Sequence, residues 1–314
     1  MMKKIIVVGG GRWGTNHIRT LIQLNCFGGV VEPYSKSQER LRTQFPDIII
    51  FNDITESLKS NPDGYTVATP PETHFDIGSE IINNDKPVLI EKPLTLDYKT
   101  SKGLVDLAKS RNVNLMVGHV LLFHPAIQKI KTLIDDNRIG KLKYLYSNRL
   151  NLGTIRSSED VFWSLAPHDI SIFQYFINSY PDKINSFSHC YIQKDVNDIT
   201  MANFEYYDNI KAHIFTSWVN PFKEHKLVVI GSKGMIVFED SSNDKDILLY
   251  DEYYANDKSM ESIDVIKKEP VVIDYERSMP LTNELKYFIE NLDATIDIAN
   301  GSSGLEVIEI LESI

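Results

Sequence analysis

Residues 3–19 read KKIIVVGGGRWGTNHIR, and this stretch decides how the first half of the chain folds. A short apolar run, Ile5 to Val8, leads into a glycine turn, and a segment compatible with a helix follows at once. Strand, glycine turn and helix come in the order that a dinucleotide-binding βα unit requires. The sequence therefore predicts a dinucleotide site at residues 9–14.

Each glycine of this turn has a physical task. Gly9 permits the tight turn after the strand, Gly11 lets the backbone approach a diphosphate, and Gly14 lets the helix pack close to the sheet. The diphosphate would meet free N–H groups and the positive end of the helix dipole. Arg12 and Trp13, which lie between the last two glycines, are predicted to contact the cofactor with them.

A second strand, Gly28 to Glu32, ends in a carboxylate that lies 18 residues after Gly14. An acid about 20 residues beyond the glycines binds the ribose hydroxyls of NAD in this kind of unit. A carboxylate there also repels a 2′-phosphate, so NAD is favoured over NADP. Lys36 is the one nearby basic residue that would weaken this preference for NAD. A solvated acid at a strand end is the alternative for Glu32.

Composition limits the partners. The 314 residues carry 33 basic and 43 acidic side chains, a net charge of −10, which argues against nucleic acid or an anionic membrane as the main partner. The longest apolar stretch, Leu115 to Phe123, is interrupted by Gly118 and His119 and is too short to span a membrane. Two distant cysteines, Cys26 and Cys190, give no disulfide framework, so a cytoplasmic setting is expected.

Strands alternate with helices over the first 120 or so residues, which predicts a doubly wound parallel sheet, an α/β fold. The length suggests two domains, and we place them at residues 1–121 and 122–314. Ligands of such sheets bind at the carboxyl ends of the strands. TPPETH (69–74) and EKP (91–93) fall at those ends, so Thr69, Pro70, His74, Glu91 and Lys92 are predicted to line the cofactor site.

After about Phe123 the pattern changes to consecutive strands. Leu142 to Leu152 alternates as a strand, and Pro167 to Ile177 is an amphipathic helix. Several strand-like runs follow, with a hairpin turn at residues 231–234. The second domain is therefore predicted to be α+β with a mostly antiparallel sheet, and the final helix is free to pack back on the first domain.

Two side chains suit proton chemistry. Lys92 follows a strand end and precedes Pro93, which restricts the backbone of residue 92 to extended geometry. His168 lies in the first turn of the helix that starts at Pro167, where the helix dipole disfavours the charged imidazole, so a neutral ring is available as a general base. Asp169 is interpreted as an acid at the N-terminus of this helix.

The sequence contains no histidine pair with a matching acid, so it does not indicate a metal site. It also lacks the GxSxG elbow that is typical of hydrolases.

GGGRWG, TPPETH, EKP and the PHD helix start, in this order, resemble the Gfo/Idh/MocA family of NAD(P)-dependent sugar and cyclitol oxidoreductases. The resemblance covers essentially the whole chain. It implies a Rossmann domain, a second domain with an open antiparallel sheet that forms a homo-oligomer (dimer or tetramer), and a sugar as substrate. The stretch 153–169 looks most like the branch that acts on nucleotide-linked sugars. By position, substrate contacts are implied for Lys92, His119, Arg149, Asn151, Arg156, Trp163 and His168, with Lys92 and His168 catalytic. For Arg149, Asn151 and Arg156 the alternative is an exposed or salt-bridged polar side chain.

The chain departs from the family pattern at one point. His168 matches the histidine of a DxxxH signature, but the residue four before it is Ser164. Two alternatives therefore stand beside a dehydrogenase: a protein that senses NAD or a sugar without catalysis, and an enzyme that holds NAD tightly and oxidises its substrate transiently during elimination or hydrolysis.

Overall fold

The computed structural model describes residues 3–156, 159–251 and 268–314. The chain divides into two compact units. The N-terminal unit takes the chain up to Phe123 and again from Ser278 to Glu312, and the C-terminal unit takes His124–Arg277 with the last two residues. The expected boundary near residue 121 is thus close to the first crossing, but both closing helices, rather than only the last, return to the N-terminal unit.

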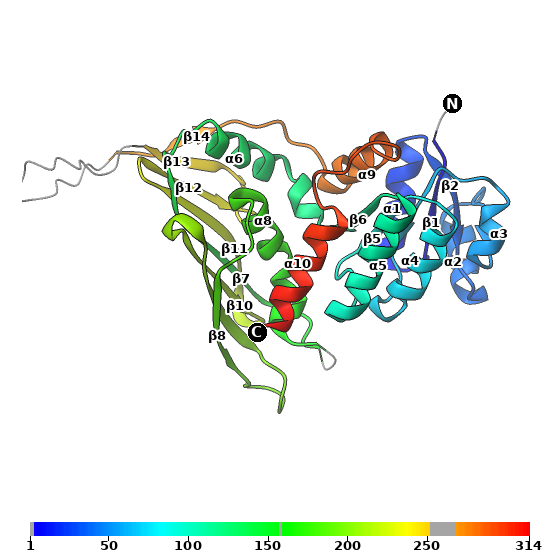
Figure 1. The fold of residues 1–314 in the computed structure, drawn as a ribbon, viewed down its shortest axis with the longest axis horizontal. Helices are drawn as coiled ribbons and strands as arrows, with labels where there is room; N and C mark the ends of the chain where they lie inside the picture. The colour runs from blue at the N-terminus through cyan, green and yellow to red at the C-terminus, as the bar shows by residue number, and fades with distance from the viewer. Residues whose placement is uncertain (1–2, 157–158, 252–267) are drawn as a thin grey trace, which may run out of the picture. The chain divides into compact units, whose positions relative to one another are not determined.

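The N-terminal unit is built on a six-stranded parallel sheet in the order β3-β2-β1-β4-β5-β6, which confirms the doubly wound prediction (Figure 1). All four residues of β1 are buried, as are those of β4, β5 and β6, because helices cover both faces of such a sheet. The strands are β1 (Ile5–Val8), β2 (Phe27–Val31), β3 (Ile50–Phe51), β4 (Gly64–Val67), β5 (Val88–Glu91) and β6 (Leu115–Gly118).

The helices of this unit are α1 (Arg12–Gln23), α2 (Ser35–Gln44), α3 (Ile54–Leu58), α4 (His74–Asn83), α5 (Tyr98–Arg111), α9 (Pro280–Glu290) and α10 (Gly301–Glu312), with 3₁₀ turns η1 (Pro71–Thr73) and η2 (Val120–Phe123). α10 packs against α5 and β6. Gly304 makes this contact possible, since a Cβ there would lie 2.4 Å from Cγ2 of Val117. The segment before α10 also pairs with the sheet, because Val117 N donates to Ala299 O at 2.8 Å.

The C-terminal unit contains an eight-stranded sheet in the order β14-β13-β12-β11-β7-β10-β9-β8. Every neighbouring pair is antiparallel except β7 and β10, so the expected antiparallel sheet is confirmed with one exception. Its strands are β7 (Leu142–Leu152), β8 (Lys183–His189), β9 (Ile199–Glu205), β10 (Lys211–Ser217), β11 (Val219–Gly231), β12 (Gly234–Glu239), β13 (Ile247–Asp251) and β14 (Val271–Ile273).

Helices lie on one face of this sheet only, and β11 and β7 are its two central strands (Figure 1). Leu145, Ile214 and Val229 point from neighbouring strands into the core under these helices and are fully buried. The helical elements of the unit are α6 (Pro125–Asp135), α7 (Val161–Leu165), α8 (Pro167–Ile177) and the 3₁₀ turn η3 (Tyr207–Asn209). Among the described residues of the whole chain, no helix is both long and apolar enough to span a membrane.

Candidate functional site

The glycine turn has the geometry that its sequence predicts. Gly9 has a φ of +96°, which L side chains rarely adopt. A Cβ on Gly14 would lie 1.9 Å from the carbonyl oxygen of Gly9, so this glycine sets how closely α1 approaches the turn. A Cβ on Gly11 would meet nothing within 4 Å. The backbone at Gly11, the N-cap of α1, is therefore open to a ligand.

A cavity of about 500 Å³ opens in front of this turn, within the size range of ligand pockets in proteins. Its walls come from the carboxyl ends of β1, β2 and β4 and from α2, at the edge of the sheet where ligands of such folds bind. The wall includes five residues predicted from the sequence to meet the cofactor: Gly9, Gly11, Glu32, Thr69 and Pro70. The shape and the open glycine backbone fit a dinucleotide.

Glu32 stands directly after β2 and is 5% exposed. Its Oε2 accepts a hydrogen bond from Gly10 N at 2.9 Å, and its Oε1 accepts one from Tyr34 N at 3.1 Å. The carboxylate is therefore fixed against the glycine turn on the cavity wall and is not a solvated strand-end acid. This position suits a negative group that selects against a 2′-phosphate.

Arg40 also lines the cavity, although no sequence motif indicated this residue. Its NH2 donates to the carbonyl of Gly10 at 2.5 Å, so Gly10 is held by Glu32 on its N–H and by Arg40 on its C=O. Arg40 belongs to α2, whose sequence SKSQERLRTQ buries only Leu41. A helix with one buried side chain has no apolar stripe, which is why periodicity does not reveal it.

Glu91, the last residue of β5, points into a buried cluster. Trp13 Nε1 donates to its Oε1, and His17 Nε2 lies 2.9 Å from the same oxygen. Trp13 and His17 are one helical turn apart on α1, so this pair ties the helix to the strand. Glu91 is thus engaged by α1 inside the unit, and its predicted contact with the cofactor stays a prediction. Trp13, at 39% exposure, remains open on its other side.

Lys92 follows Glu91 at the carboxyl end of β5 and is only partly buried. The peptide bond between Lys92 and Pro93 is cis. The Lys92 charge is close enough to His119 to add to the effect of burial, and together they lower the pKa of His119 to about 3. His119 is therefore neutral at physiological pH. The side chain is 2% exposed, and its predicted contact with a substrate stays a prediction.

His74 is also wholly buried. Its Nδ1 lies 2.9 Å from Pro93 O and its Nε2 lies 3.0 Å from Thr69 O. The ring connects the loop after β4 to the loop after β5. His74 therefore holds together two loops that carry predicted cofactor residues, and its own contact with the cofactor stays a prediction.

In the C-terminal unit, Arg149 and Asp169 form a buried ion pair between β7 and the first turn of α8. Arg149 Nε and NH2 donate to the two carboxylate oxygens at 2.5 and 2.9 Å, and Ser147 Oγ donates to Oδ1 at 2.6 Å. Burial opposes the charge on Arg149, but Asp169 outweighs it and the pKa of Arg149 is raised. Both residues are under 10% exposed. The guanidinium of Arg149 is engaged by Asp169, and its expected substrate contact stays a prediction.

The same ion pair acts on a neighbouring histidine. Burial, with a contribution from the charge of Arg149, lowers the pKa of His225 to about 4. His225 lies on β11 opposite Arg149 in the sheet. It is therefore neutral at physiological pH.

His168 precedes Asp169 in α8 and is partly buried. Its backbone carbonyl accepts a hydrogen bond from Ser171 Oγ at 2.8 Å. Ser164 lies on the separate helix α7, so the two positions of the family signature fall on either side of the junction at Ala166. The ion pair of Asp169 fixes the turn that carries His168.

The remaining predicted substrate residues lie at or near the surface of this unit. Asn151 is the second-last residue of β7 and Trp163 lies in α7, and both are partly buried. Arg156 is 52% exposed and forms an ion pair with Glu159 at 2.7 Å. Ser157 and Ser158, within the stretch that resembles the nucleotide-sugar branch, lie outside the described residues.

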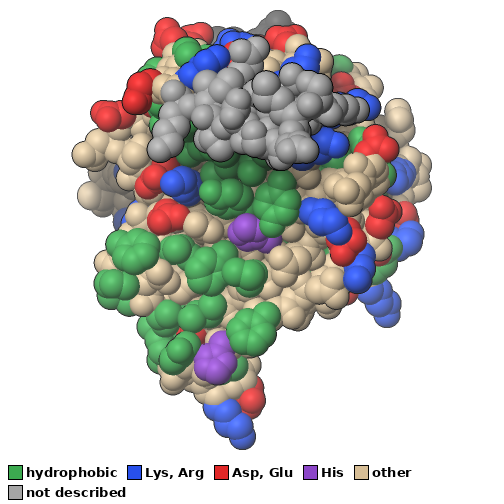
Figure 2. Space-filling view, turned by 90° about the vertical axis from the view of Figure 1, so that its left-hand side faces the viewer, with side chains coloured by type: hydrophobic (Ala, Val, Ile, Leu, Met, Phe, Trp, Pro, Cys, Tyr) green, Lys and Arg blue, Asp and Glu red, His purple; other side chains and the backbone are tan. Residues whose placement is uncertain are grey.

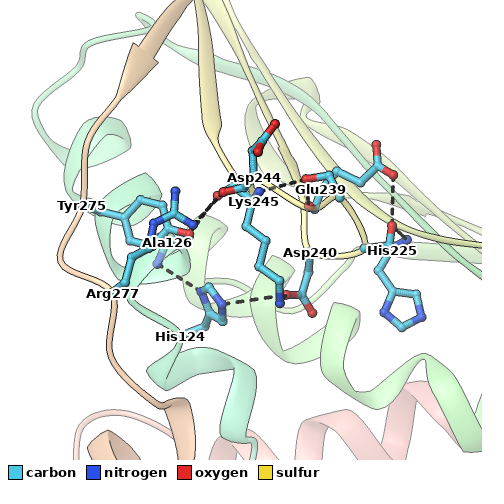
Figure 3. Close-up of polar contacts among 11 residues, drawn as sticks. His124, Ala126, His225, Glu239, Asp240, Asp244, Lys245, Tyr275 and Arg277 are labelled. Carbon is cyan, nitrogen blue, oxygen red and sulfur yellow. Dashed lines mark hydrogen bonds and ion pairs between the residues drawn. The ribbon is translucent and has the colours of Figure 1, made fainter.

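A further polar cluster surrounds His124 at the start of α6 (Figure 3). Its Nδ1 accepts a hydrogen bond from Ala126 N at 3.1 Å, and its Nε2 lies 3.9 Å from Asp240 Oδ1. Lys245 donates to the same oxygen at 2.8 Å. The ammonium group of Lys245 already pairs with the Asp240 carboxylate, so the cluster does not suit a metal ion. Within the described ranges no three His, Cys, Asp or Glu side chains could hold a metal ion together.

Two family descriptions match the chain. Residues 3–119 match "Oxidoreductase family, NAD-binding Rossmann fold", and residues 127–237 match "GFO/IDH/MocA C-terminal domain". Among curated relatives, UDP-N-acetylglucosamine 3-dehydrogenase of Acidithiobacillus ferrooxidans is 27% identical over 53% of this chain and 51% of its own length. The scyllo-inositol 2-dehydrogenase (NAD⁺) of Bacillus subtilis is 29% identical over 55% of this chain and 53% of its own. The chain thus spans about half the length of these relatives in each alignment.

The solved structures agree on the fold over the full length. A structure of the A. ferrooxidans UDP-N-acetylglucosamine 3-dehydrogenase superposes with a TM-score of 0.86 at 20% identity, covering 100% of this chain and 97% of that one. An inositol dehydrogenase homologue from Azotobacter vinelandii, complexed with NADH and myo-inositol, superposes with a TM-score of 0.81 at 15% identity, covering 99% and 94%. At these identities the likeness shows the fold alone.

Proposed function

Because the chain belongs to the Gfo/Idh/MocA family of NAD-binding oxidoreductases, we propose that it oxidises or reduces a ring carbon of a sugar, with a nucleotide-linked sugar as the preferred class. Oxidation removes a hydride from the ring carbon and a proton from its hydroxyl group. NAD, when bound, accepts that hydride or donates it in the reverse direction. The residues of this chain must then hold the substrate and accept the proton.

One observation carries the proposal. Lys92 lies at the carboxyl end of β5, on the same edge of the parallel sheet as the cavity formed by the glycine turn, Glu32 and Thr69. In open parallel sheets this edge is where ligands bind. An amine lies at such a strand end, beside a dinucleotide cavity. This arrangement suits redox chemistry on a bound hydroxyl or carbonyl group better than binding of the dinucleotide without catalysis.

Two residues are proposed for the proton chemistry. As an ammonium, Lys92 would donate a hydrogen bond to the reacting oxygen and stabilise negative charge on it. His168 would accept the hydroxyl proton, since a free histidine has a pKa of about 6.5 and a free lysine about 10.4. The first helical turn of α8 also favours a neutral ring at His168. The two residues belong to different units of the chain, so this division of roles stands as a proposal.

The preference for a nucleotide-linked sugar has narrower support. The relatives named above include a UDP-N-acetylglucosamine 3-dehydrogenase, and the segment from Gly153 to Asp169 resembles that branch. Asn151, Arg156 and Trp163 stay as proposed substrate contacts, because each has exposed surface on the C-terminal unit. Arg149 and His119 stay as proposed contacts too, although both side chains are buried.

Replacement of Lys92 by alanine tests the role of the amine. We expect kcat for the sugar to fall by about 10²–10⁴-fold, the range of a lost acid–base or charge-stabilising group. Calorimetric titration with NAD separates loss of chemistry from loss of cofactor. Lys109→Ala, which removes an exposed lysine of α5, is the matched control and should keep the activity of the unchanged protein. Full activity in Lys92→Ala would refute the proposed role.

We also propose that the open face of the eight-stranded sheet binds a second copy of the chain. The register places Phe187, Met201 and Phe215 side by side on this face, and a second row contains Val272, Leu248, Val237 and Tyr146. Phe187 is 69% exposed and Val272 is 56% exposed. Apolar side chains gather on the side of the molecule where this sheet lies (Figure 2). Large exposed apolar patches mark interaction sites, and a continuous sheet face can pair with itself around a twofold axis.

Glutamate at Met201 should therefore disrupt the assembly. A buried charge in the middle of an apolar interface is costly to desolvate, so Met201→Glu is expected to convert a dimer or tetramer to a monomer. Multi-angle light scattering after gel filtration measures the mass. Ile22→Glu is the control, because Ile22 is 43% exposed on α1 of the other unit. A monomeric unchanged protein would refute the proposed interface.

A further inference from the structure

Asp198 is a fully buried carboxylate of the C-terminal unit, at the end of the loop 190–197 that joins β8 to β9. Its Oδ2 accepts hydrogen bonds from Tyr191 N at 2.6 Å and from Ile192 N at 2.7 Å, and its Oδ1 accepts one from Trp218 Nε1. Burial opposes the charge on Asp198, but these hydrogen bonds outweigh it, so the pKa of Asp198 is lowered. The ionised carboxylate therefore holds the two ends of the loop together.

Loop 190–197 has little burial of its own to define its shape. None of its residues, all of which the structure describes, is buried, and the side chains of Tyr191 and Ile192 are 69% and 52% exposed. Segments with few buried contacts open easily unless hydrogen bonds fix them. Trp218, by contrast, is 1% exposed. Asp198 thus ties an exposed loop to the buried interior of the unit.

The loop is bonded in turn to the backbone that leads into α7. Gln193 Nε2 donates to the carbonyl oxygen of Arg156 at 2.9 Å. Val161 N, at the start of α7, donates to Asn197 O at 3.0 Å. A displaced loop would therefore release the backbone at Arg156 and at the first residue of α7.

The same loop supports the N-cap of α7. Asn197 Nδ2 donates to Asp160 Oδ2 at 3.3 Å, and Asp160 Oδ1 accepts a hydrogen bond from Trp163 N at 2.9 Å. An N-cap acid fixes the first turn of its helix. Arg156 and Trp163 are both proposed substrate contacts, and both are attached to backbone that this loop holds.

We propose that Asp198 is a positioning residue for the nucleotide end of the substrate, because it fixes loop 190–197 and the loop fixes Arg156 and Trp163. A guanidinium group matches the geometry of phosphate oxygens, and Arg156 is 52% exposed despite its ion pair with Glu159, so it suits the diphosphate of a nucleotide-linked sugar. The substrate class rests on the proposed function, whereas the chain of hydrogen bonds from Asp198 to Arg156 does not.

Hydrogen exchange measures the loop itself, whatever the chain catalyses. Asp198→Asn keeps the size of the side chain but has one acceptor oxygen fewer, so a donor is left unpaired. The amides of Tyr191 and Ile192 should exchange about 10-fold faster in this variant, and the amide of Val161 should follow them. If the amide of Val161 stays protected while the other two exchange faster, the loop does not hold α7 and the proposal is overturned.

Calorimetric titration with UDP, on protein saturated with NAD, measures the positioning without turnover, since UDP carries the nucleotide end and no sugar to oxidise. In Asp198→Asn we expect Kd for UDP to rise about 10–100-fold, the effect of misplaced binding groups. Asp195→Asn removes the same charge from an exposed position of the same loop and should bind UDP as the unchanged protein does. Affinity for NAD should be equal in all three proteins.

A second variant keeps the test decisive if Asp198→Asn does not fold. Gln193→Ala removes only the hydrogen bond to Arg156 O from a partly buried side chain, and should weaken UDP binding about 2–10-fold. Unchanged UDP binding in either variant, an equal loss of NAD affinity, or no UDP binding by the unchanged protein would overturn the proposal. If UDP binds and responds as expected but no sugar is oxidised, the proposal stands and the proposed function fails.

Discussion

Replacement of Asp169 by alanine is expected to lower the free energy of unfolding of the C-terminal unit by about 3–5 kcal/mol. The change leaves the guanidinium of Arg149 buried without its partner, and Ser147 Oγ loses its acceptor as well. Urea unfolding followed by tryptophan fluorescence measures the effect, since Trp163 and Trp218 report on this unit. A loss of that size in one side chain would make Asp169 one of the most important residues for this unit's stability.

Two control variants compare the stability contribution of this buried ion pair with that of a solvent-exposed pair and of an apolar replacement. Lys102→Ala removes an ion pair whose side chains are 49% and 56% exposed, and should cost about 0–1 kcal/mol. The double variant Arg149→Met with Asp169→Leu replaces the pair by apolar groups and should recover most of the stability, because no unpaired charge remains. If Asp169→Ala costs no more than Lys102→Ala, the pair does not anchor α8 to β7.

Alanine at Gly14 should weaken NAD binding by about 10–100-fold, since overpacking of about 1–3 kcal/mol must be relieved by moving the glycine turn. The new Cβ would lie 1.9 Å from the carbonyl oxygen of Gly9, and no rotation of a side chain relieves a clash with backbone. The melting temperature should fall as well, because the clash exists without any ligand. Isothermal titration with NAD and thermal unfolding measure the two effects.

Gly11→Ala is the matched variant. Its Cβ meets nothing within 4 Å and its φ of −66° suits any residue, so the fold and the melting temperature should be retained. NAD binding should still weaken, because the added methyl group enters the space where the diphosphate approaches the backbone. If Gly11→Ala binds NAD as tightly as the unchanged protein, the diphosphate does not lie at this turn.

Local sequence patterns predicted much of the fold. The expected strand at Leu142–Leu152 and the expected helix at Pro167–Ile177 have the bounds found in the structure, because alternation and helical periodicity are properties of neighbouring residues. The glycine turn was recognisable for the same reason. α2 was missed because its exposed polar sequence has no apolar stripe, although Arg40 and Ser37 bring it to the cavity wall.

Long-range contacts explain what the sequence did not reveal. Glu91 and His74 lie in segments that face the cofactor edge of the sheet, but their side chains are occupied by His17 and by the carbonyls of Pro93 and Thr69. Arg149 was expected at a substrate, yet Asp169, 20 residues away, engages it. The return of α9 to the N-terminal unit, which buries Glu284, depends on packing across more than 150 residues of chain. No local pattern encodes such pairings.

The most direct test of the account follows the nicotinamide absorbance when the purified protein is mixed with NAD⁺ and UDP-N-acetylglucosamine, with other UDP-sugars and myo-inositol as further probes. Hydride transfer from a sugar ring predicts steady formation of NADH with at least one probe, and its consumption when the corresponding keto-sugar is supplied with NADH. Tight binding of NAD with no hydride transfer in either direction would contradict the account and identify the chain as a protein that binds the dinucleotide without this chemistry.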